Sequence, residues 1–220
     1  MNKLIEKAFE GEVGNIFLLS LFITFCLITF VIVCYQIDSN FANKVTGIVF
    51  SNILVGRVPA LSFGYAAHLP HSVVIIINIV VEMIMVTFIY PLFVYSFRGV
   101  LKIRVLEDFF LEVKKKKDAH KKKFDRYGKF GLFVFVFIPF WMTGPIVGSI
   151  IGFLIGMNHY IVIFIVFIAT IISITLWGVF LQEIINFLLT FNTQLVWIVL
   201  FIIVGVLLIY RFKDKLLKKD

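Results

Sequence analysis

The sequence predicts an all-α integral membrane protein with four crossing helices and two opposed re-entrant helical hairpins that form an inverted repeat. Three observations lead to this prediction. Of the 220 residues, 61% are hydrophobic and the mean hydropathy is +1.04, whereas soluble domains are about 45–50% apolar. Several uncharged runs approach the ~20 residues that a helix needs to cross a bilayer. The basic residues, finally, gather in two stretches of the chain.

We interpret the apolar segments as one membrane domain that occupies residues 1–220. Crossing helices are expected at residues 16–37, 72–97, 160–181 and 194–210, and hairpins at residues 47–69 and 130–157. The first crossing could be mistaken for a signal peptide. It is longer than a typical signal-peptide core and no clear cleavage site follows, so we expect it to be retained.

The distribution of basic residues predicts the topology. Twelve of the 21 Lys and Arg residues lie between Arg98 and Lys129, and five lie between Arg211 and Lys219. Six full crossings would place these stretches on opposite sides, against the tendency of basic loops to stay in the cytoplasm. Two hairpins that each enter and leave on one side bring both stretches together. We therefore expect a plasma-membrane protein whose two termini and loop 98–129 are cytoplasmic.

The two hairpin segments share prolines and glycines that a continuous membrane helix disfavours. As one helix, residues 130–157 would be ~42 Å long, against a hydrocarbon core of ~30 Å. A break between Trp141 and Gly144 would give two arms that reach the midplane and return. Pro and Gly are five residues apart in both segments, at Pro59–Gly64 and Pro139–Gly144. Broken segments in matching places with opposite orientation indicate an inverted repeat of the transporter kind.

Two ionisable residues lie within the apolar segments, Arg57 and Glu82. We expect Pro59 and Pro145 to begin helical arms, whose free N-terminal amides and Arg57 together suit an anion. Glu82 is the candidate for proton coupling. The alternative is that Arg57 and Glu82 only pair and hold the hairpin to its neighbouring helix. The expected substrate-binding residues are Arg57, Pro59, Gly64, Glu82, Pro139, Thr143, Gly144 and Pro145.

Other classes of function find little support in the sequence. It has no HExxH, GxSxG, Walker A or GxGxxG motif in the required context, so we expect no enzyme, no catalytic residue and no cofactor. His68 and His71 lack a third metal ligand nearby, so no metal site is expected. Basic clusters beside apolar segments favour membrane orientation, or contact with anionic lipids, over nucleic acid. The expected partners are membrane lipids and a small-molecule or lipid-phosphate substrate, and homo-oligomerisation is left open.

The hairpins also carry a family resemblance. "GLFVFVFIPFWMTGPIVGSIIGFLIGM" (131–157) and "GRVPALSFG" (56–64) resemble the small multidrug export protein family, which is distantly similar to the DedA/VTT membrane proteins. The resemblance implies a small secondary transporter or exporter of an amphiphilic or anionic small molecule. A DedA-like translocase of polyprenyl phosphate or lipid, and a non-transporting membrane scaffold, are the alternatives. The residues that carry the resemblance are Arg57, Pro59, Ile138, Pro139, Thr143, Gly144 and Gly148.

Overall fold

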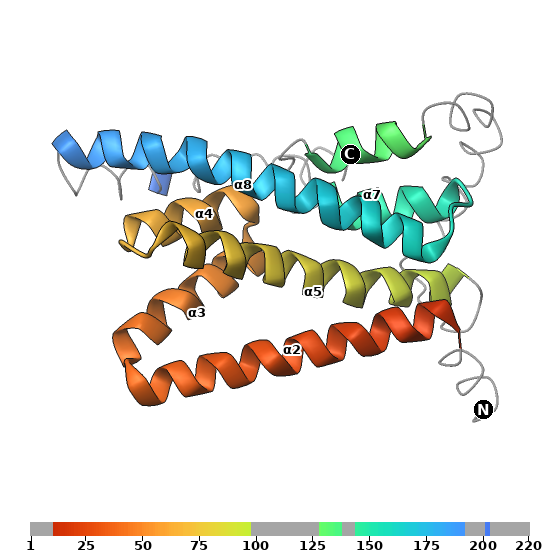
Figure 1. The fold of residues 1–220 in the computed structure, drawn as a ribbon, viewed down its shortest axis with the longest axis horizontal. Coiled ribbons are helices and arrows are strands. Elements are labelled where there is room, and N and C mark those ends of the chain that lie inside the picture. The colour runs from red at the N-terminus through yellow and green to blue at the C-terminus, as the bar shows by residue number, and fades with distance from the viewer. Residues whose placement is uncertain (1–10, 98–127, 138–143, 192–200, 203–220) are drawn as a thin grey trace, which may run out of the picture.

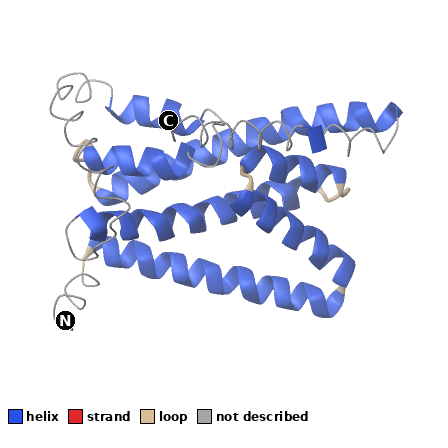
Figure 2. Cartoon of the chain, turned by 180° about the vertical axis from the view of Figure 1, so that it is seen from behind, coloured by secondary structure: helices blue, strands red, loops and turns tan. Residues whose placement is uncertain are grey.

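The computed structural model of the protein describes residues 11–97, 128–137, 144–191 and 201–202, and within these ranges all regular elements are helices (Figure 2). Three of the helices are long and apolar enough to cross a membrane: α2 (Glu12–Ile37), α5 (His71–Phe97) and α8 (His159–Phe191). They coincide with three of the crossings expected from the sequence. The chain is therefore a membrane protein, as its composition predicts.

Some expectations fall on residues that the structure does not describe. The fourth crossing, at 194–210, lies outside the described residues apart from helical Phe201 and Ile202. The basic loop 98–129 lies outside them too, except for the last two residues, which begin a helix at Gly128–Phe137. That helix is called helix 128–137 below.

α8 is longer than the sequence analysis expects. The sequence predicts a crossing at 160–181, but the helix continues to Phe191. Neither Gly nor Pro occurs between Leu181 and Phe191 to end the helix. The carboxylate of Glu183 is compatible with this continuation because its side chain is exposed.

The first hairpin begins earlier than expected. The sequence predicts this hairpin at residues 47–69, but α3 already begins at Ser39 and runs to Leu54. Asp38 separates α2 from α3, and its carboxylate accepts hydrogen bonds from the backbone N–H groups of Asn40 and Phe41. This is an N-terminal cap, which satisfies two amides that the helix itself cannot. One capping residue therefore makes the whole turn.

The break within the first hairpin lies at Val55–Gly56, and α4 (Arg57–Ala66) begins directly after it. Pro59, which was expected to begin this arm, is instead its third residue. Proline is tolerated there because the first-turn N–H groups have no acceptor within the helix. Gly56 has φ 115° and ψ −175°, a conformation that is essentially restricted to glycine. The break therefore depends on Gly56 more than on the proline.

α5 is the central helix and packs against α2, α3, α4, α7 (Gly144–Leu154) and α8 (Figure 1). Buried apolar side chains form two cores along it. One joins the start of α5 to α3, α4 and the later part of α8. The other joins the end of α5 to the first turn of α2, helix 128–137, α7 and the start of α8. Each core thus includes one pair of short helices, α3 with α4 in the first core and helix 128–137 with α7 in the second.

The turn from α4 to α5 and the turn from α7 to α8 have the same backbone pattern. Each contains one residue with positive φ, His68 at 57° and Gly156 at 88°, as in a Schellman motif. The equivalent residues, such as Gly64 and Gly152, lie 88 positions apart. The N–H to C=O bonds are Ala67 to Phe63, His68 to Tyr65 and Leu69 to Gly64 in the first turn, and Ile155 to Ile151, Gly156 to Phe153 and Met157 to Gly152 in the second.

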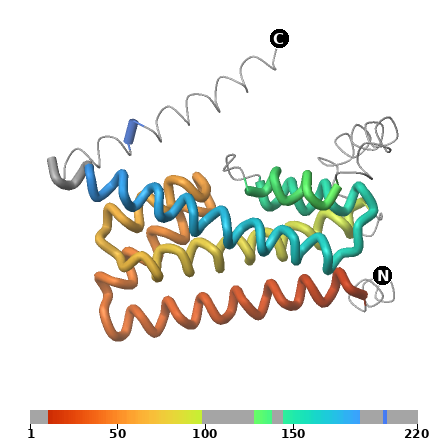
Figure 3. The backbone as a smooth tube through the Cα atoms, turned by 45° about the horizontal axis from the view of Figure 1, so that its top comes forward, coloured from red at the N-terminus to blue at the C-terminus, as the bar shows by residue number. Residues whose placement is uncertain are grey.

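The first unit, α4 with α5, and the second unit, α7 with α8, have opposite orientations. α5 and α8 lie side by side but run in opposite directions, and the two turns lie at opposite ends of the molecule (Figures 1 and 3). The register differs from the one read from the sequence, which paired Pro59–Gly64 with Pro139–Gly144. In the structure Gly64 corresponds to Gly152. The earlier pairing was wrong because it matched proline spacing, whereas the shared constraint is the close packing of a glycine against the next helix.

Candidate functional site

Arg57 and Glu82 form a buried, two-pronged ion pair between the first hairpin and α5. Arg57 Nε donates to Glu82 Oε1 at 2.7 Å, and Nη2 donates to Oε2 at 2.6 Å. Both residues are only 7% exposed. Among the described residues this is the only ion pair. Parallel hydrogen bonds of this kind are the strongest and most directional that an arginine makes with a carboxylate.

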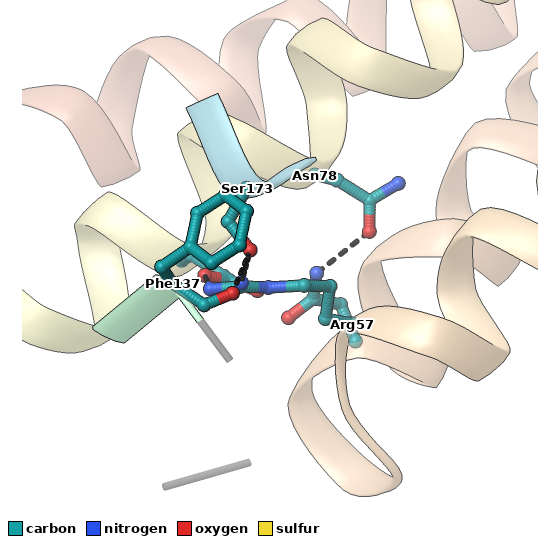
Figure 4. Close-up of polar contacts among 6 residues, drawn as sticks. Arg57, Asn78, Phe137 and Ser173 are labelled. Atoms are coloured by element: carbon teal, nitrogen blue, oxygen red, sulfur yellow. Dashed lines mark hydrogen bonds and ion pairs between the residues drawn. The ribbon is translucent and has the colours of Figure 1, made fainter. Parts of the chain in front are cut away.

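The remaining side of the guanidinium contacts the second unit. Arg57 Nη1 donates to Ser173 Oγ on α8, and Ser173 Oγ donates to the backbone carbonyl of Phe137 at 2.6 Å. Phe137 is the last described residue of helix 128–137. Figure 4 shows how this chain of hydrogen bonds links α4, α8 and helix 128–137. The ion pair therefore joins both halves of the molecule.

A second buried polar pair lies beside the first. Asn52 Nδ2 on α3 donates to Asn78 Oδ1 on α5 at 2.7 Å (Figure 4). Asn78 Nδ2 donates to the carbonyl of Val74 at 2.8 Å. The two side chains are 2% and 0% exposed. Asn78 is one turn before Glu82 and so lies on the same face of α5. Both arms of the first hairpin are thus bound to one polar face of α5.

The polar pairs border a small cavity where the starts of two short helices meet. The cavity has a volume of about 20 Å³. Gly56 and Arg57 from the start of α4 and Pro145 and Ile146 from the start of α7 line it. Asn52, Glu82, Met85 and Val86 complete its wall. A space of this size holds about one water molecule, so it is too small for a substrate molecule in this conformation.

The charges around the cavity are unequal. A helix N-terminus has a partial charge of roughly +0.5, because its first amides are unpaired. Arg57 and the starts of α4 and α7 therefore present more positive charge than the single Glu82 carboxylate neutralises. Oriented amides together with a guanidinium are the usual groups that bind carboxylate or phosphate in proteins. The charge balance of the cavity therefore favours a negatively charged group over a positively charged one.

The comparisons with known proteins agree with a membrane protein of this kind. Residues 57–179 match the family described as "Putative small multi-drug export protein". The chain belongs to this family. The match begins at Arg57 and includes Glu82 and Ser173. No curated protein and no solved structure matches the chain, and no comparison links it to the DedA/VTT proteins.

The structure brings together several of the residues expected at the site of this export-family protein. Arg57, Glu82 and Pro145 border the cavity, and Gly144 immediately precedes Pro145 at the start of α7. Gly64 lies elsewhere, because it packs against Val74 and Ile48 within the first core. Pro59 is buried in α4 and is not part of the cavity wall. Pro139 and Thr143 lie outside the described residues.

Three polar side chains at the site of the export-family chain were not expected from the sequence: Asn52, Asn78 and Ser173. Asn78 could have been found, since an asparagine one turn from a buried glutamate in an otherwise apolar helix indicates a polar face. Asn52 and Ser173 gave no such signal, because serine and asparagine also occur in membrane helices to bond local carbonyls.

His71 and Tyr65 hydrogen-bond each other at 3.0 Å, and the described residues contain no cluster able to hold a metal ion.

Proposed function

We propose that the protein is a small secondary transporter that exports an anionic or amphiphilic anionic molecule across the plasma membrane, with Arg57 as the anion-binding residue. The observation that carries this proposal is the buried Arg57–Glu82 pair at the meeting point of two helix starts. Its family name, which refers to export, supports transport over catalysis. A DedA-like lipid-phosphate translocase would use the same anion chemistry with a larger apolar substrate.

The lengths of the short helices support re-entrant hairpins. α4 has 10 residues and α7 has 11, so each is ~15–17 Å long, about half of a ~30 Å hydrocarbon core. Each also packs beside the helix that precedes it. A Cβ built on Gly148 of α7 would lie 2.5 Å from Val136 of helix 128–137, for example. The short helix of each hairpin therefore has a length that matches the distance between the membrane surface and the midplane.

The depth of Glu82 supports a binding site near the midplane. It is the twelfth of the 27 residues of α5, ~17 Å from the start of a helix that is ~40 Å long. Non-helical backbone such as the Val55–Gly56 break is tolerated at this depth only when protein or a watery cavity covers it. Broken helices whose N-termini face an anion at the midplane are a recurring arrangement in secondary transporters.

The proposed topology can be tested at the two equivalent turns. After replacement of Cys26 and Cys34 by alanine, we expect His68→Cys to react with a membrane-impermeant maleimide from outside the cell. Asn158→Cys should react only after permeabilisation, because the second turn lies at the opposite end of the molecule. Both side chains are exposed, which makes them suitable for labelling. Labelling of both from the same side would contradict the opposed hairpins.

Glu82 competes with the substrate for Arg57 in this proposal. The carboxylate occupies the Nε and Nη2 side of the guanidinium, so withdrawal of Glu82 frees this two-pronged face for an external anion. Protonation of Glu82 removes its negative charge and weakens its hold on Arg57. Uptake of one proton on Glu82 would therefore accompany binding of one anion.

Flux in proteoliposomes tests the proposal. We expect the purified protein to carry benzoate or phenyl phosphate faster when a proton gradient is imposed. Arg57→Gln should abolish this flux, because the guanidinium is the only cationic side chain among the described residues that line the cavity. Glu82→Gln should make the residual flux independent of the proton gradient, because glutamine cannot take up a proton.

The control is Glu183→Gln, which removes an exposed carboxylate of α8 and should leave flux unchanged. Flux of the cation ethidium, with none of benzoate or phenyl phosphate, would contradict an anion site. Absence of any flux, with intact binding of lipids or proteins, would favour the membrane scaffold instead.

A further inference from the structure

An apolar groove lies between the three long helices, on the other side of α5 from the Arg57–Glu82 cavity. Its volume is about 480 Å³. Leu19 and Ile23 of α2, Met83 and Thr87 of α5, and Phe164 and Phe167 of α8 are among its walls. Met83 directly follows Glu82, so one turn of α5 forms a wall of both the polar cavity and the groove.

Apart from the hydroxyl groups of Thr87 and Tyr160, the residues that line the groove are apolar. Its buried polar side chain, Thr87, donates its hydroxyl to the carbonyl of Met83 at 2.6 Å and so has its donor occupied. The three helices that form the groove are also the candidate membrane spans, so the groove lies at the level of the lipid chains. Apolar cavities of this kind stay dry and take up hydrocarbon.

The dimensions suit one hydrocarbon chain. The groove extends from Ile79 to Thr87 on α5 and from Tyr160 to Phe167 on α8, which corresponds to ~10–12 Å along each helix. This is close to the thickness of one leaflet, about half of the ~30 Å core. The volume is roughly three times that of the ~150 Å³ cavity that accepts benzene. A single acyl chain matches both measures.

One end of the groove carries a polar collar of four residues, Glu12, Asn15, Asn158 and Tyr160. Tyr160 lines the groove and accepts a hydrogen bond from Asn15 Nδ2 at 3.2 Å through its hydroxyl. Glu12 accepts from Asn158 Nδ2 only at 3.4 and 3.5 Å, so its carboxylate retains acceptor capacity. All four residues are exposed. A carboxylate at this level repels anionic head groups and attracts an ammonium group.

We propose that this groove binds one acyl chain of a membrane phospholipid, and that the polar collar holds an ammonium head group such as that of phosphatidylethanolamine. The bound chain packs against Met83 and Thr87 and so supports the turn of α5 that carries Glu82. This lipid site is separate from the transport site. Lipid binding at this groove does not depend on anion transport by the protein.

Photochemical labelling in nanodiscs tests the lipid site. Phosphatidylethanolamine with a diazirine at the middle of one acyl chain should label groove residues severalfold more than exposed Phe25, which lies on α2 outside the groove. Ile79→Trp fills the groove from α5 and should reduce this labelling to the level of Phe25. Leu19→Trp fills it from α2, where the native side chain is 47% exposed, and should do the same without crowding the core.

The matched control is Ile76→Trp, at a position of α5 that is 56% exposed and outside the groove, and it should not change the labelling. Phosphatidylethanolamine should label the groove about fivefold more than phosphatidylglycerol, the equivalent of ~1 kcal/mol for one charge at a membrane surface. Glu12→Gln should remove this preference. Equal labelling of Phe25 and the groove, or labelling unaffected by both tryptophans, would overturn the proposal. Protein–protein cross-links at Leu19 in place of lipid adducts would do so as well.

Discussion

Replacing Arg57 by methionine should lower the free energy of unfolding by about 3–5 kcal/mol, because it leaves the Glu82 carboxylate buried without its partner. Glu82→Leu should cost a similar amount, because the guanidinium would then keep only the Ser173 hydroxyl among its present partners. The paired variant, Arg57→Met with Glu82→Leu, should lie within about 1 kcal/mol of the native protein. Replacing a whole buried ion pair by apolar side chains of similar volume is often neutral or stabilising.

Unfolding in mixed detergent micelles measures these free energies, and Glu183→Leu is the control for loss of an exposed carboxylate, expected within about 0.5 kcal/mol of the native protein. If the paired variant were as unstable as the sum of the single variants, the two residues would not be coupled. The paired variant also separates structure from function. It should fold but carry no anion, and normal flux through it would show that the pair has only a structural role.

The second large effect is expected at the glycines that bring each hairpin against its following helix. A Cβ on Gly64 would lie 2.8 Å from a methyl group of Val74, and a Cβ on Gly152 would lie 2.8 Å from a methyl group of Val162. Valine cannot easily rotate away, since its χ1 is restricted in a helix. Gly64→Ala and Gly152→Ala should each lower the free energy of unfolding by about 1–3 kcal/mol, the usual cost of overpacking.

Double variants test whether the two units are equivalent. Val74→Ala should relieve Gly64→Ala, and Val162→Ala should relieve Gly152→Ala, whereas the crossed combination of Gly64→Ala with Val162→Ala should show no rescue. Gly131→Ala is the control, because a Cβ there meets nothing within 4 Å, and it should stabilise its helix by about 1 kcal/mol. Rescue by either valine regardless of the glycine would contradict the proposed equivalence.

The two units differ at the positions that correspond to the Arg57–Glu82 pair. The residue 88 positions after Glu82 is Thr170, which is completely buried and whose hydroxyl has no hydrogen-bond partner within the part of the chain that the structure describes. The residue that corresponds to Arg57 is Pro145, at the start of α7. The two units therefore share a backbone design, while the charged pair belongs to the first unit and reaches the second through Ser173.

The sequence by itself determined the membrane class, three long helices and the two charged residues within the apolar segments, while their pairing was left open. Apolar length suffices for a crossing, since a bilayer requires ~20 apolar residues wherever they occur. Arg57 and Glu82 were identifiable because a charge within an apolar segment is too costly to occur without a partner or a role. α7 begins at Gly144, next to Pro145, which was expected to begin a helical arm because proline favours the start of a helix.

Only the tertiary structure decided the start of the first hairpin, the register of the two units and the partners of Arg57. A hydrophobicity pattern does not reveal that Asp38 alone turns the chain, because capping depends on local geometry rather than on polarity. Gly64 and Gly152 are equivalent because each allows a valine of the next helix to approach closely, a contact between segments that no local spacing encodes. Ser173 joins the site for the same reason: the antiparallel packing of α5 and α8 brings it to Arg57 from 116 residues away.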